Sequence, residues 1–340
     1  MANLLRERGW EARIVLPRGR ESLRKRVAQW LSLGRWRGRT TGFLHEFKGP
    51  TATFRTLNDL SYQPNEIVIA VGTYSVPDVR ALTKPVVKLR FNHGFPAKPD
   101  ALQEQAWRGS MPTITVSNTL VPRLRELSGE DVLAVVPNGI DTRVYFPDTS
   151  IESRPAIGAV LNSHPNKAPE DMLAVLAEAH QRHPDRPQVI FSTERRPEAL
   201  AHTDYHRLPS ADQARRLYNR AKVWLLTSRT EGLPGVVLEA MACGCVVIST
   251  DNDGSLEILR HEENGLIVPR GDRAAFLAQI DRVFSSPDLA ARLSNAALTT
   301  TQQFTWARAA DKMETVLQSL HRTAPTSHCV SVASPPRQTP

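Results

Sequence analysis

The sequence has few features of a secreted or membrane-spanning protein. Its 340 residues include only three cysteines, Cys243, Cys245 and Cys329, and the first two flank a glycine in an apolar segment. An odd number in this setting indicates reduced thiols rather than a disulfide framework. A metal site would need more Cys or His at ligand spacing, and none lies near. There is no run of 18 apolar residues, and the start, MANLLRERGWEARIV, lacks the apolar core and cleavage site of a signal peptide. These absences favour a cytoplasmic protein.

The net positive charge of the chain is confined to its N-terminal part. The formal net charge is +8, and residues 1–50 carry twelve Lys/Arg against four Asp/Glu, which accounts for all of it. Within 21–39, Leu23, Val27, Trp30 and Leu31 share one helical face while basic residues occupy the other. This pattern is typical of an interfacial helix on an anionic membrane. The alternative is an ordinary amphipathic helix that covers the N-terminal sheet. No nucleic-acid reader motif accompanies these residues, so no nucleic-acid partner is expected.

Strand-like and helix-like segments alternate along the chain, which predicts parallel α/β architecture. Short apolar runs predict buried strands: ARIVLP, EIVIAVG, PVVKLRF, TITVSN and LAVVPNG in the first half, and AIGAVLN, QVIFST, VWLLTS, CVVIST and GLIVPRG in the second. The clearest predicted helix is 169–183, where Met172, Val175 and Leu176 share a face. Ser210 and Gln213 form the pattern of a capping box at the start of another helix.

The length and the turn signals predict two domains. Asn138-Gly139 and nearby prolines mark the boundary, after which a Gly-containing strand restarts the pattern. We therefore expect an N-terminal Rossmann-like domain over 1–145 and a second α/β domain over 146–303. A final helix is predicted at 304–321. The tail, 322–340, is rich in Pro, Ser and Thr and is predicted to be disordered.

The stretch RTEGLPGVVLEAMACG contains two glutamates around the predicted start of a helix. Pro234 suits the first helical position and Gly244 suits the left-handed residue after the last turn. The amides of Gly235 and Val236 would then lack helical partners and form an anion site suited to a diphosphate. A carboxylate is a poor neighbour for phosphate but a good acceptor for vicinal hydroxyls. Glu231 and Glu239 on either side of this helix start therefore suit a nucleotide-diphosphate sugar, whereas the alternative is a helix cap and a solvated side chain.

The same block resembles a known family. E-x7-E followed by AMACG-C-VVIST and DGSLEILRHEENGLIVPRGD is similar to the C-terminal signature of retaining GT-B glycosyltransferases of family four. VPNGID resembles the entry into their C-terminal domain, and FTWARAA resembles their final helix. The likeness covers about 85–320 and is strongest over 223–272. It implies two Rossmann-like, doubly wound parallel-sheet domains that face a cleft. The first domain would lie on the acceptor side, the second would bind the donor, and the final helix would cross back onto the N-terminal domain.

The resemblance also implies roles for single residues. Glu231 would contact hydroxyls of the donor sugar, Lys167 would neutralise the diphosphate, and His93 would lie near the reacting centre. Glu239 would hold the ribose. The full set implied for the donor site is Glu239, Gly232, Leu233, Gly235, Val236, Gly254 and Ser255. No metal ion or other cofactor is expected, because Asp251-Asn252-Asp253, which has the form of a metal-binding D-x-D, follows a strand of the GT-B-like block.

Two departures from the family pattern bear on these expectations. NLLRERGWEARIVLP resembles the family's first helix and second strand, so we expect an N-terminal sheet that lacks its inner first strand and Gly-rich loop. Such a sheet would expose unpaired backbone. The arginine that usually accompanies Lys167 is also missing, because Leu161 or Asn162 stands there, and Arg195 or Arg196 would have to substitute for it.

The sequence therefore predicts a cytoplasmic, metal-independent, retaining glycosyltransferase (a hexosyltransferase-type enzyme) that acts at or near the inner membrane face. Its donor would be a nucleotide sugar, and its acceptor a glycan or a lipid-linked sugar in the synthesis of a surface polysaccharide or glycolipid. The alternative is a truncated, non-catalytic GT-B protein that binds a sugar nucleotide or a partner. A GT-B enzyme of other chemistry, such as an epimerase, is disfavoured by the E-x7-E block.

Overall fold

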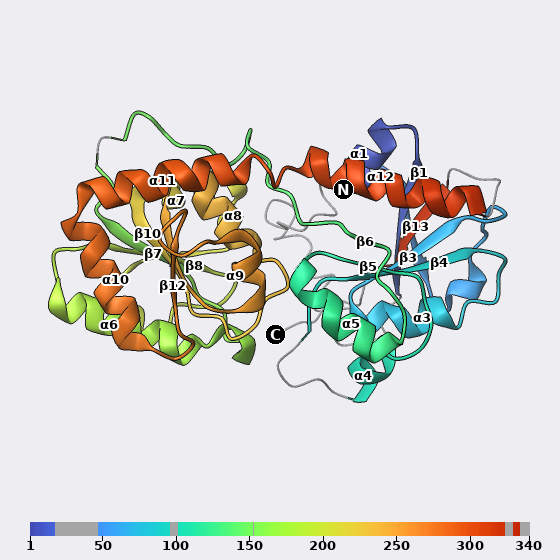
Figure 1. The fold of residues 1–340 in the computed structure, drawn as a ribbon, viewed down its shortest axis with the longest axis horizontal. Helices are drawn as coiled ribbons and strands as arrows, with labels where there is room; N and C mark the ends of the chain where they lie inside the picture. Colours follow the sequence, from blue (N-terminus) through green and yellow to red (C-terminus); the bar gives the residue numbers. More distant parts are fainter. Residues whose placement is uncertain (18–46, 96–100, 152, 324–328, 334–340) are drawn as a thin grey trace, which may run out of the picture.

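The chain folds into two α/β domains, each built around one parallel sheet. The structure is a computed structural model that describes residues 1–17, 47–95, 101–151, 153–323 and 329–333. Figure 1 shows the N-terminal domain on the right and the C-terminal domain on the left. Seven strands form the first sheet and six form the second, and every strand pair is parallel. The predicted two-domain, parallel-sheet architecture is confirmed.

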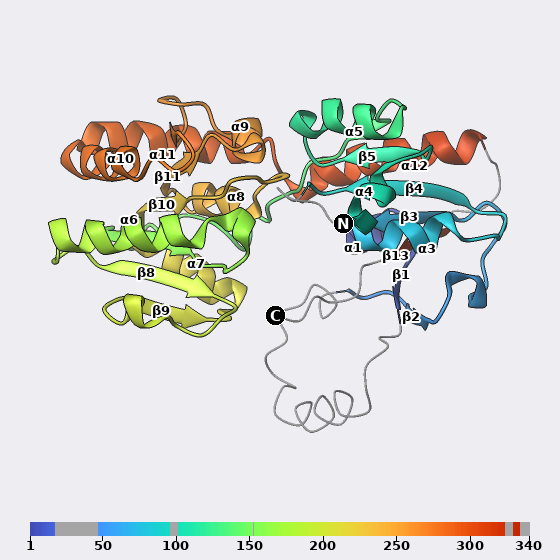
Figure 2. The same cartoon turned by 90° about the horizontal axis from the view of Figure 1, so that it is seen from below.

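The N-terminal sheet has the strand order β2-β1-β13-β3-β4-β5-β6. Its strands are β1 (Glu11–Pro17), β2 (Thr51–Phe54), β3 (Ile67–Val71), β4 (Val87–Asn92), β5 (Thr113–Thr115), β6 (Ala134–Val135) and β13 (Cys329–Ala333). The helices of this domain are α1 (Ala2–Glu7), α3 (Val76–Arg80), α4 (Ala101–Trp107), α5 (Val121–Ser128) and α12 (Trp306–Thr323). Helices lie on both faces of the sheet (Figure 2), so its inner strands are buried.

The C-terminal sheet has the order β12-β11-β10-β7-β8-β9. Its strands are β7 (Ala156–Val160), β8 (Gln188–Ser192), β9 (Asp204–Arg207), β10 (Ala221–Leu226), β11 (Val246–Thr250) and β12 (Leu266–Val268). Its helices are α6 (Pro169–Arg182), α7 (Ala211–Arg220), α8 (Gly235–Ala242), α9 (Asp253–Ile258), α10 (Arg273–Ser285) and α11 (Pro287–Thr301). The strand order reverses beside β7 and β10, and ligands of open α/β sheets bind at such points, outside the carboxyl ends of the strands.

Local sequence signals explain several of these elements. The predicted helix at 169–183 is α6, which buries Met172, Val175 and Leu176 against the sheet. The Ser210 side chain accepts from the Gln213 amide while the Gln213 side chain accepts from the Ser210 amide, so the predicted capping box opens α7. None of the helices in the ranges described here is both long and apolar enough to cross a bilayer.

Two connections between the domains lie against each other. The amide of Ile140, after β6, donates to the carbonyl of Phe304, before α12, at 2.7 Å. A Cβ on Gly139 would lie 2.3 Å from the backbone nitrogen of Trp306, so this close approach requires glycine. Helix α12 then runs along the N-terminal domain, roughly in line with α11 (Figure 1), although it follows the C-terminal domain in sequence.

The structure corrects two expectations about the N-terminal sheet. Residues 322–340 are not uniformly without structure, because α12 continues to Thr323 and Cys329–Ala333 form β13. The inner position that the resemblance leaves empty is also filled, since β13 lies between β1 and β3 and pairs with both. The prediction of disorder rested on the Pro, Ser and Thr content of the whole tail. It overlooked the short run CVSVA, whose small and β-branched side chains suit an inner strand.

Candidate functional site

The centre of the candidate site is the start of α8, in the loop that follows β10. Pro234 is the residue before the helix and Gly235 is its first residue, one position later than predicted. A Cβ on Gly235 would meet no atom within 4 Å, so the space in front of the helix start is open. The first amides of a helix have no intrahelical acceptor and carry partial positive charge. The geometry therefore suits an anion at Gly235 and Val236.

Lys167 and Glu231 contact each other directly at this site. The Lys167 ammonium lies 2.6 Å from Glu231 Oε1, although 64 residues separate them. The Ser228 hydroxyl donates to the same oxygen at 2.7 Å. Lys167 ends a 3-10 turn after β7, and Glu231 follows β10, so the two neighbouring strands bring them together. The Glu231 side chain is only 10% exposed, and its position is fixed by these two donors.

Glycines let the loops around Glu231 pack closely. A Cβ on Gly254, at the start of α9, would lie 2.8 Å from Glu231 Cβ and from the Glu231 carbonyl oxygen. A Cβ on Gly232 would lie 1.8 Å from the carbonyl oxygen of His93, which belongs to the other domain. Only residues without a side chain permit these approaches. The loop after β10 thus joins the donor-side loops to the loop after β4.

His93 faces the C-terminal domain from the carboxyl end of β4. Its ring centroid lies 4.3 Å from that of Phe91. His93 is an exposed residue by surface area. The protein around its ring nevertheless desolvates the imidazole, and this burial lowers its pKa to about 4. At neutral pH the imidazole is therefore uncharged, with one nitrogen able to donate and the other able to accept.

Leu233 contributes its backbone rather than its side chain. The Leu233 side chain is buried, and its carbonyl accepts from the Asn138 side-chain amide at 3.1 Å. Asn138 lies in the first connection between the domains. This bond ties the loop of the candidate site to that connection.

Glu239 lies one turn inside α8 and is held by tyrosines that the sequence interpretation missed. The Tyr218 hydroxyl donates to Glu239 Oε2 at 2.7 Å. Burial raises the pKa of Glu239, whereas hydrogen bonds from Tyr218 and Tyr145 oppose that shift. Tyr218 is fully buried, with its ring 4.2 Å from that of Trp224. No local pattern links Tyr218 on α7 to Glu239 on α8, because only the packing of the two helices sets their register.

Ser255 is engaged in a buried network that supports the start of α9. Its amide donates to the Asn252 side-chain oxygen at 2.9 Å, and its hydroxyl accepts from Ser249 and from the Asn252 amide group, each at 2.8 Å. Both polar groups of Ser255 therefore hold the loop, while Gly254 is the residue that packs on Glu231.

The D-x-D segment and the arginines near the candidate site occupy different surroundings. Asp251 pairs with Arg270 at 3.1 Å, and Asn252 caps α9. Among the residues with described placement, no group of three or more His, Cys, Asp and Glu is arranged to hold a metal ion. Arg195 and Arg196 are exposed in the loop after β8, and Leu161 is buried. Lys167 is thus the cation in direct contact with Glu231.

The two facing parallel-sheet domains, with a helix start and its glutamates at their junction, define a GT-B protein. In agreement, the fold is similar to that of HepE from Anabaena, solved with UDP-glucose, with a TM-score of 0.70 and 14% identity over 91% of this chain and 99% of that one. Residues 154–300 match the family model of the glycosyl transferases group 1. The fold of the chain is therefore GT-B, and its C-terminal domain is similar to the glycosyl transferases group 1 family.

Curated relatives show the same likeness. The glycosyltransferase YtcC of Bacillus subtilis is 28% identical over 239 residues, which are 60% of this chain and 58% of the relative. The amylovoran biosynthesis glycosyltransferase AmsK of Erwinia amylovora is 33% identical over 78 residues, 21% of this chain and 19% of the relative. The matched parts thus span less than two thirds of the length of these relatives.

Proposed function

We propose that the protein is a retaining glycosyltransferase of the hexosyltransferase type. It transfers a sugar from a nucleotide-diphosphate sugar to a glycan or a lipid-linked acceptor in the synthesis of a surface polysaccharide or glycolipid. The match of residues 154–300 to the glycosyl transferases group 1 model supports transfer of a sugar, and the name of the relative AmsK supports the process. The complex of HepE with UDP-glucose supports a nucleotide-sugar donor.

One observation carries the proposal: the open start of α8 has a carboxylate on each side. Glu231, paired with Lys167, lies before the helix, and Glu239, bonded to Tyr218, lies one turn inside it. The diphosphate accepts from the amides of Gly235 and Val236. Glu231 then accepts from hydroxyls of the sugar, and Glu239 accepts from the ribose hydroxyls. When the diphosphate is bound, we expect the Lys167 ammonium to move from Glu231 to a phosphate oxygen.

The proposed step needs no covalent intermediate on the protein. The acceptor oxygen forms a bond to the anomeric carbon on the face from which the diphosphate departs, so the configuration is retained. The bond from that carbon to the diphosphate oxygen breaks, and its electron pair leaves with the nucleoside diphosphate. The proton of the acceptor hydroxyl passes to a phosphate oxygen of the leaving group. The protein positions the reactants and stabilises the developing negative charge through Lys167 and the helix start.

His93 belongs to the acceptor side of this reaction. Its uncharged ring can donate to or accept from a hydroxyl near the reacting carbon. The close approach of Gly232 to the His93 carbonyl brings the backbone of His93 beside the residue that follows Glu231. We assign His93 to orientation of the sugar or acceptor hydroxyl and not to proton transfer as a charged acid, because its lowered pKa leaves it neutral.

A lipid-linked acceptor agrees with the basic segment at 21–39, which lies outside the residues that the structure describes. We propose that this segment binds the anionic inner face of a membrane and that the protein is cytoplasmic and peripheral. Co-sedimentation with vesicles should then require anionic lipid and should decrease with Trp30→Ala. Equal sedimentation with neutral and anionic vesicles would remove this part of the proposal.

A panel of UDP-, GDP-, ADP- and dTDP-sugars tests the donor. Binding is measured by calorimetry, and turnover by release of the nucleoside diphosphate in the presence of candidate acceptors. Glu231→Gln and Glu239→Gln should impair binding or turnover of the accepted donor, whereas Glu263→Gln, an exposed glutamate away from α8, should not. If both site variants behave like the parent, the assigned roles are wrong.

The second candidate is a non-catalytic GT-B protein that binds a sugar nucleotide. It is favoured by the composition of the diphosphate site, where Leu161 and Asn162 stand at the position of the family's arginine and Lys167 is already paired with Glu231. Donor binding without release of nucleoside diphosphate, across acceptors and donors that bind, would support this candidate.

A further inference from the structure

The strand β13 has the position of a first strand although it comes last in the described chain. It lies between β1 and β3, parallel to both, with Val330 opposite Ala12 on one side and Ile67 on the other. In a doubly wound sheet the first strand lies at this point, where the strand order reverses. The order β2-β1-β13-β3-β4 reproduces that arrangement, with β13 in the central place.

Both faces of β13 are packed. Val330 belongs to the large apolar cluster that includes Trp10 and Leu317, whereas Ala333 belongs to the cluster on the opposite face, with Val76 and Phe54. Val330, Ser331 and Ala333 have no exposed surface. A strand that is buried on both faces and paired at both edges is part of the core of its domain.

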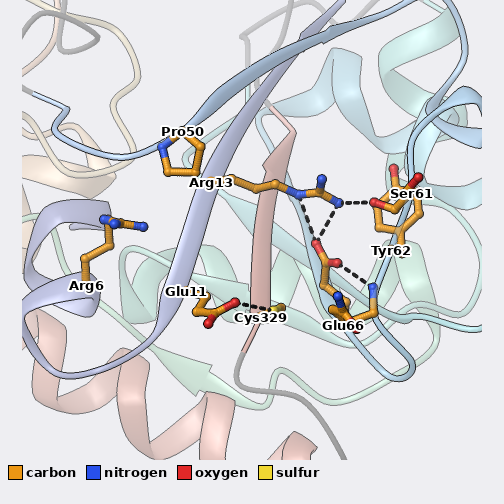
Figure 3. A pocket seen from close by; sticks show the side chains of 9 residues that line it. Arg6, Glu11, Arg13, Pro50, Ser61, Tyr62, Glu66 and Cys329 are labelled. Atoms are coloured by element: carbon orange, nitrogen blue, oxygen red, sulfur yellow. Dashed lines mark hydrogen bonds and ion pairs between the residues drawn. The ribbon is translucent and has the colours of Figure 1, made fainter.

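A buried polar contact fixes the register of β13. Ser331 lies opposite Arg13 of β1, and Arg13 Nε donates to its hydroxyl at 2.6 Å. The Ser331 hydroxyl donates in turn to Glu66, which is only 2% exposed. Arg13 reaches the same Glu66 oxygen at 3.0 Å, and Figure 3 shows these two side chains pointing toward each other.

This contact excludes neighbouring registers. A shift by one residue would place Val330 or Val332 between Arg13 and Glu66, and the buried carboxylate would lose a donor. Cys329 lies at the start of the strand, beside the cavity of about 460 Å³ in Figure 3, with its thiol 3.1 Å from Glu11. Arg13, Glu66 and Ser331 thus act as a lock for one strand in one register.

We propose that this C-terminal segment is the functional first strand of the N-terminal domain, held by the lock of Arg13, Glu66 and Ser331. In this arrangement β13 supports β3, β3 supports β4, and β4 carries His93 at its carboxyl end. The acceptor side of the cleft therefore depends on residues that follow the whole donor-binding domain in sequence.

Cross-linking of the full chain tests the strand and its register. Glu11 and Cys329 are register partners, so Glu11→Cys should form a disulfide with Cys329 under oxidised glutathione. The matched control is Ala12→Cys, one residue further, whose side chain points to the other face. Cys243 and Cys245 have no exposed surface and should not compete. Mass spectrometry of the linked peptides identifies the pair.

We expect the 11–329 disulfide in most molecules and at least tenfold less 12–329 disulfide. Equal yields for the two variants, or links mainly to other cysteines, would overturn the proposal. The result does not depend on any sugar transfer, so it is independent of the proposed function.

Truncation provides a second test. A chain that ends after Thr323 keeps the entire C-terminal domain but loses β13. In hydrogen exchange, the amides of β1 and β3 should lose at least tenfold in protection, while those of β10 and β11 should stay protected. Unchanged protection of β1 and β3 would show that β13 is dispensable and would overturn the proposal.

Discussion

The two domains differ in how much of the sequence each of them needs. The six strands of the C-terminal sheet all come from one continuous segment between Ala156 and Val268. The N-terminal sheet combines β1, the strands from β2 to β6, and β13 from beyond the other domain, and α12 packs on it from the same distant part of the chain. A domain made from one continuous segment forms by closing short loops. A domain made from distant segments must close long loops, and the entropic cost of closure grows with loop length.

This difference determines which segments of the chain position the candidate site residues. The donor-side groups, Lys167, Glu231 and Glu239, lie within one continuous domain and around one helix start. The acceptor-side residue His93 depends on a sheet that is complete only when β13 is in place. Perturbations of the N-terminal domain should therefore affect its fold, whereas perturbations near α8 should affect chemistry.

The largest effect is expected for Arg13→Leu in the N-terminal domain. This change leaves Glu66 buried without its cation and should reduce the free energy of unfolding by about 3 kcal/mol at neutral pH. Urea denaturation at neutral pH measures this loss.

The contrasting change in the C-terminal domain is Arg182→Leu, which breaks the exposed pairs of Arg182 with Glu178 and Asp281. It should cost no more than about 0.5 kcal/mol. A similar loss for both variants would contradict the expected effect of burial at Glu66.

Comparable in free energy is the effect of Lys167→Met on turnover. The variant keeps the length of the side chain but removes the cation proposed to stabilise the diphosphate, so the transfer rate should fall by about 10²–10³-fold. The thermal midpoint should also fall, because Glu231, which is only 10% exposed, loses its cationic partner. Lys222→Met, on the opposite side of the same domain, is the control and should keep the parental rate.

Gly232→Ala should separate the loops of the two domains. The new Cβ would collide with the His93 carbonyl, so the loops must move apart and the reacting groups lose alignment. We expect a decrease of about tenfold to 100-fold in kcat/KM with donor binding largely retained. Gly235→Ala is the contrasting variant: its Cβ points into open space, so it should weaken donor binding instead. The same kinetic pattern in both would exclude a separate role for the Gly232 contact.

A smaller effect is expected for Tyr218→Phe, which removes one donor from Glu239. Donor affinity should fall by about tenfold, as expected for loss of one hydrogen bond to a charged group. Without this donor the pKa of Glu239, already raised by burial, should rise further. Because the ionised carboxylate binds the ribose, the decrease in affinity at low pH should begin at a higher pH in the variant.

Tyr62→Phe is the control for this experiment, because its hydroxyl donates to a backbone carbonyl in the N-terminal domain. It should leave the pH dependence of donor affinity unchanged. An unshifted profile in Tyr218→Phe would mean that Tyr218 does not tune Glu239.

The smallest effect is expected from removal of divalent ions. The proposed step relies on Lys167 and the helix start for charge stabilisation, so EDTA should change the rate by less than about twofold. A loss of activity that Mg²⁺ or Mn²⁺ restores would contradict metal independence and would direct attention to Asp251 and its neighbours.

Much of the C-terminal domain could be predicted from sequence, because its signals are local. The strand runs, the helix α6, the capping box at Ser210 and the glutamates around α8 depend on spacing within one element. The ion pair of Lys167 and Glu231 and the bond of Tyr218 to Glu239 could not be predicted, since each joins two elements whose relative placement depends on packing.

The sequence by itself determined the class of fold, the alternation of strands and helices, and the residues around one helix start. These features depend on hydrophobic periodicity and on helix-end residues, which are signals within a few neighbouring residues. Only the tertiary structure decided that CVSVA of the tail becomes the inner strand of the first domain. The sequence of a five-residue segment is too short to predict which strands it pairs with. Its place is selected by burial on both faces and by the donors and acceptors of Arg13 and Glu66, which lie 318 and 265 residues from Ser331.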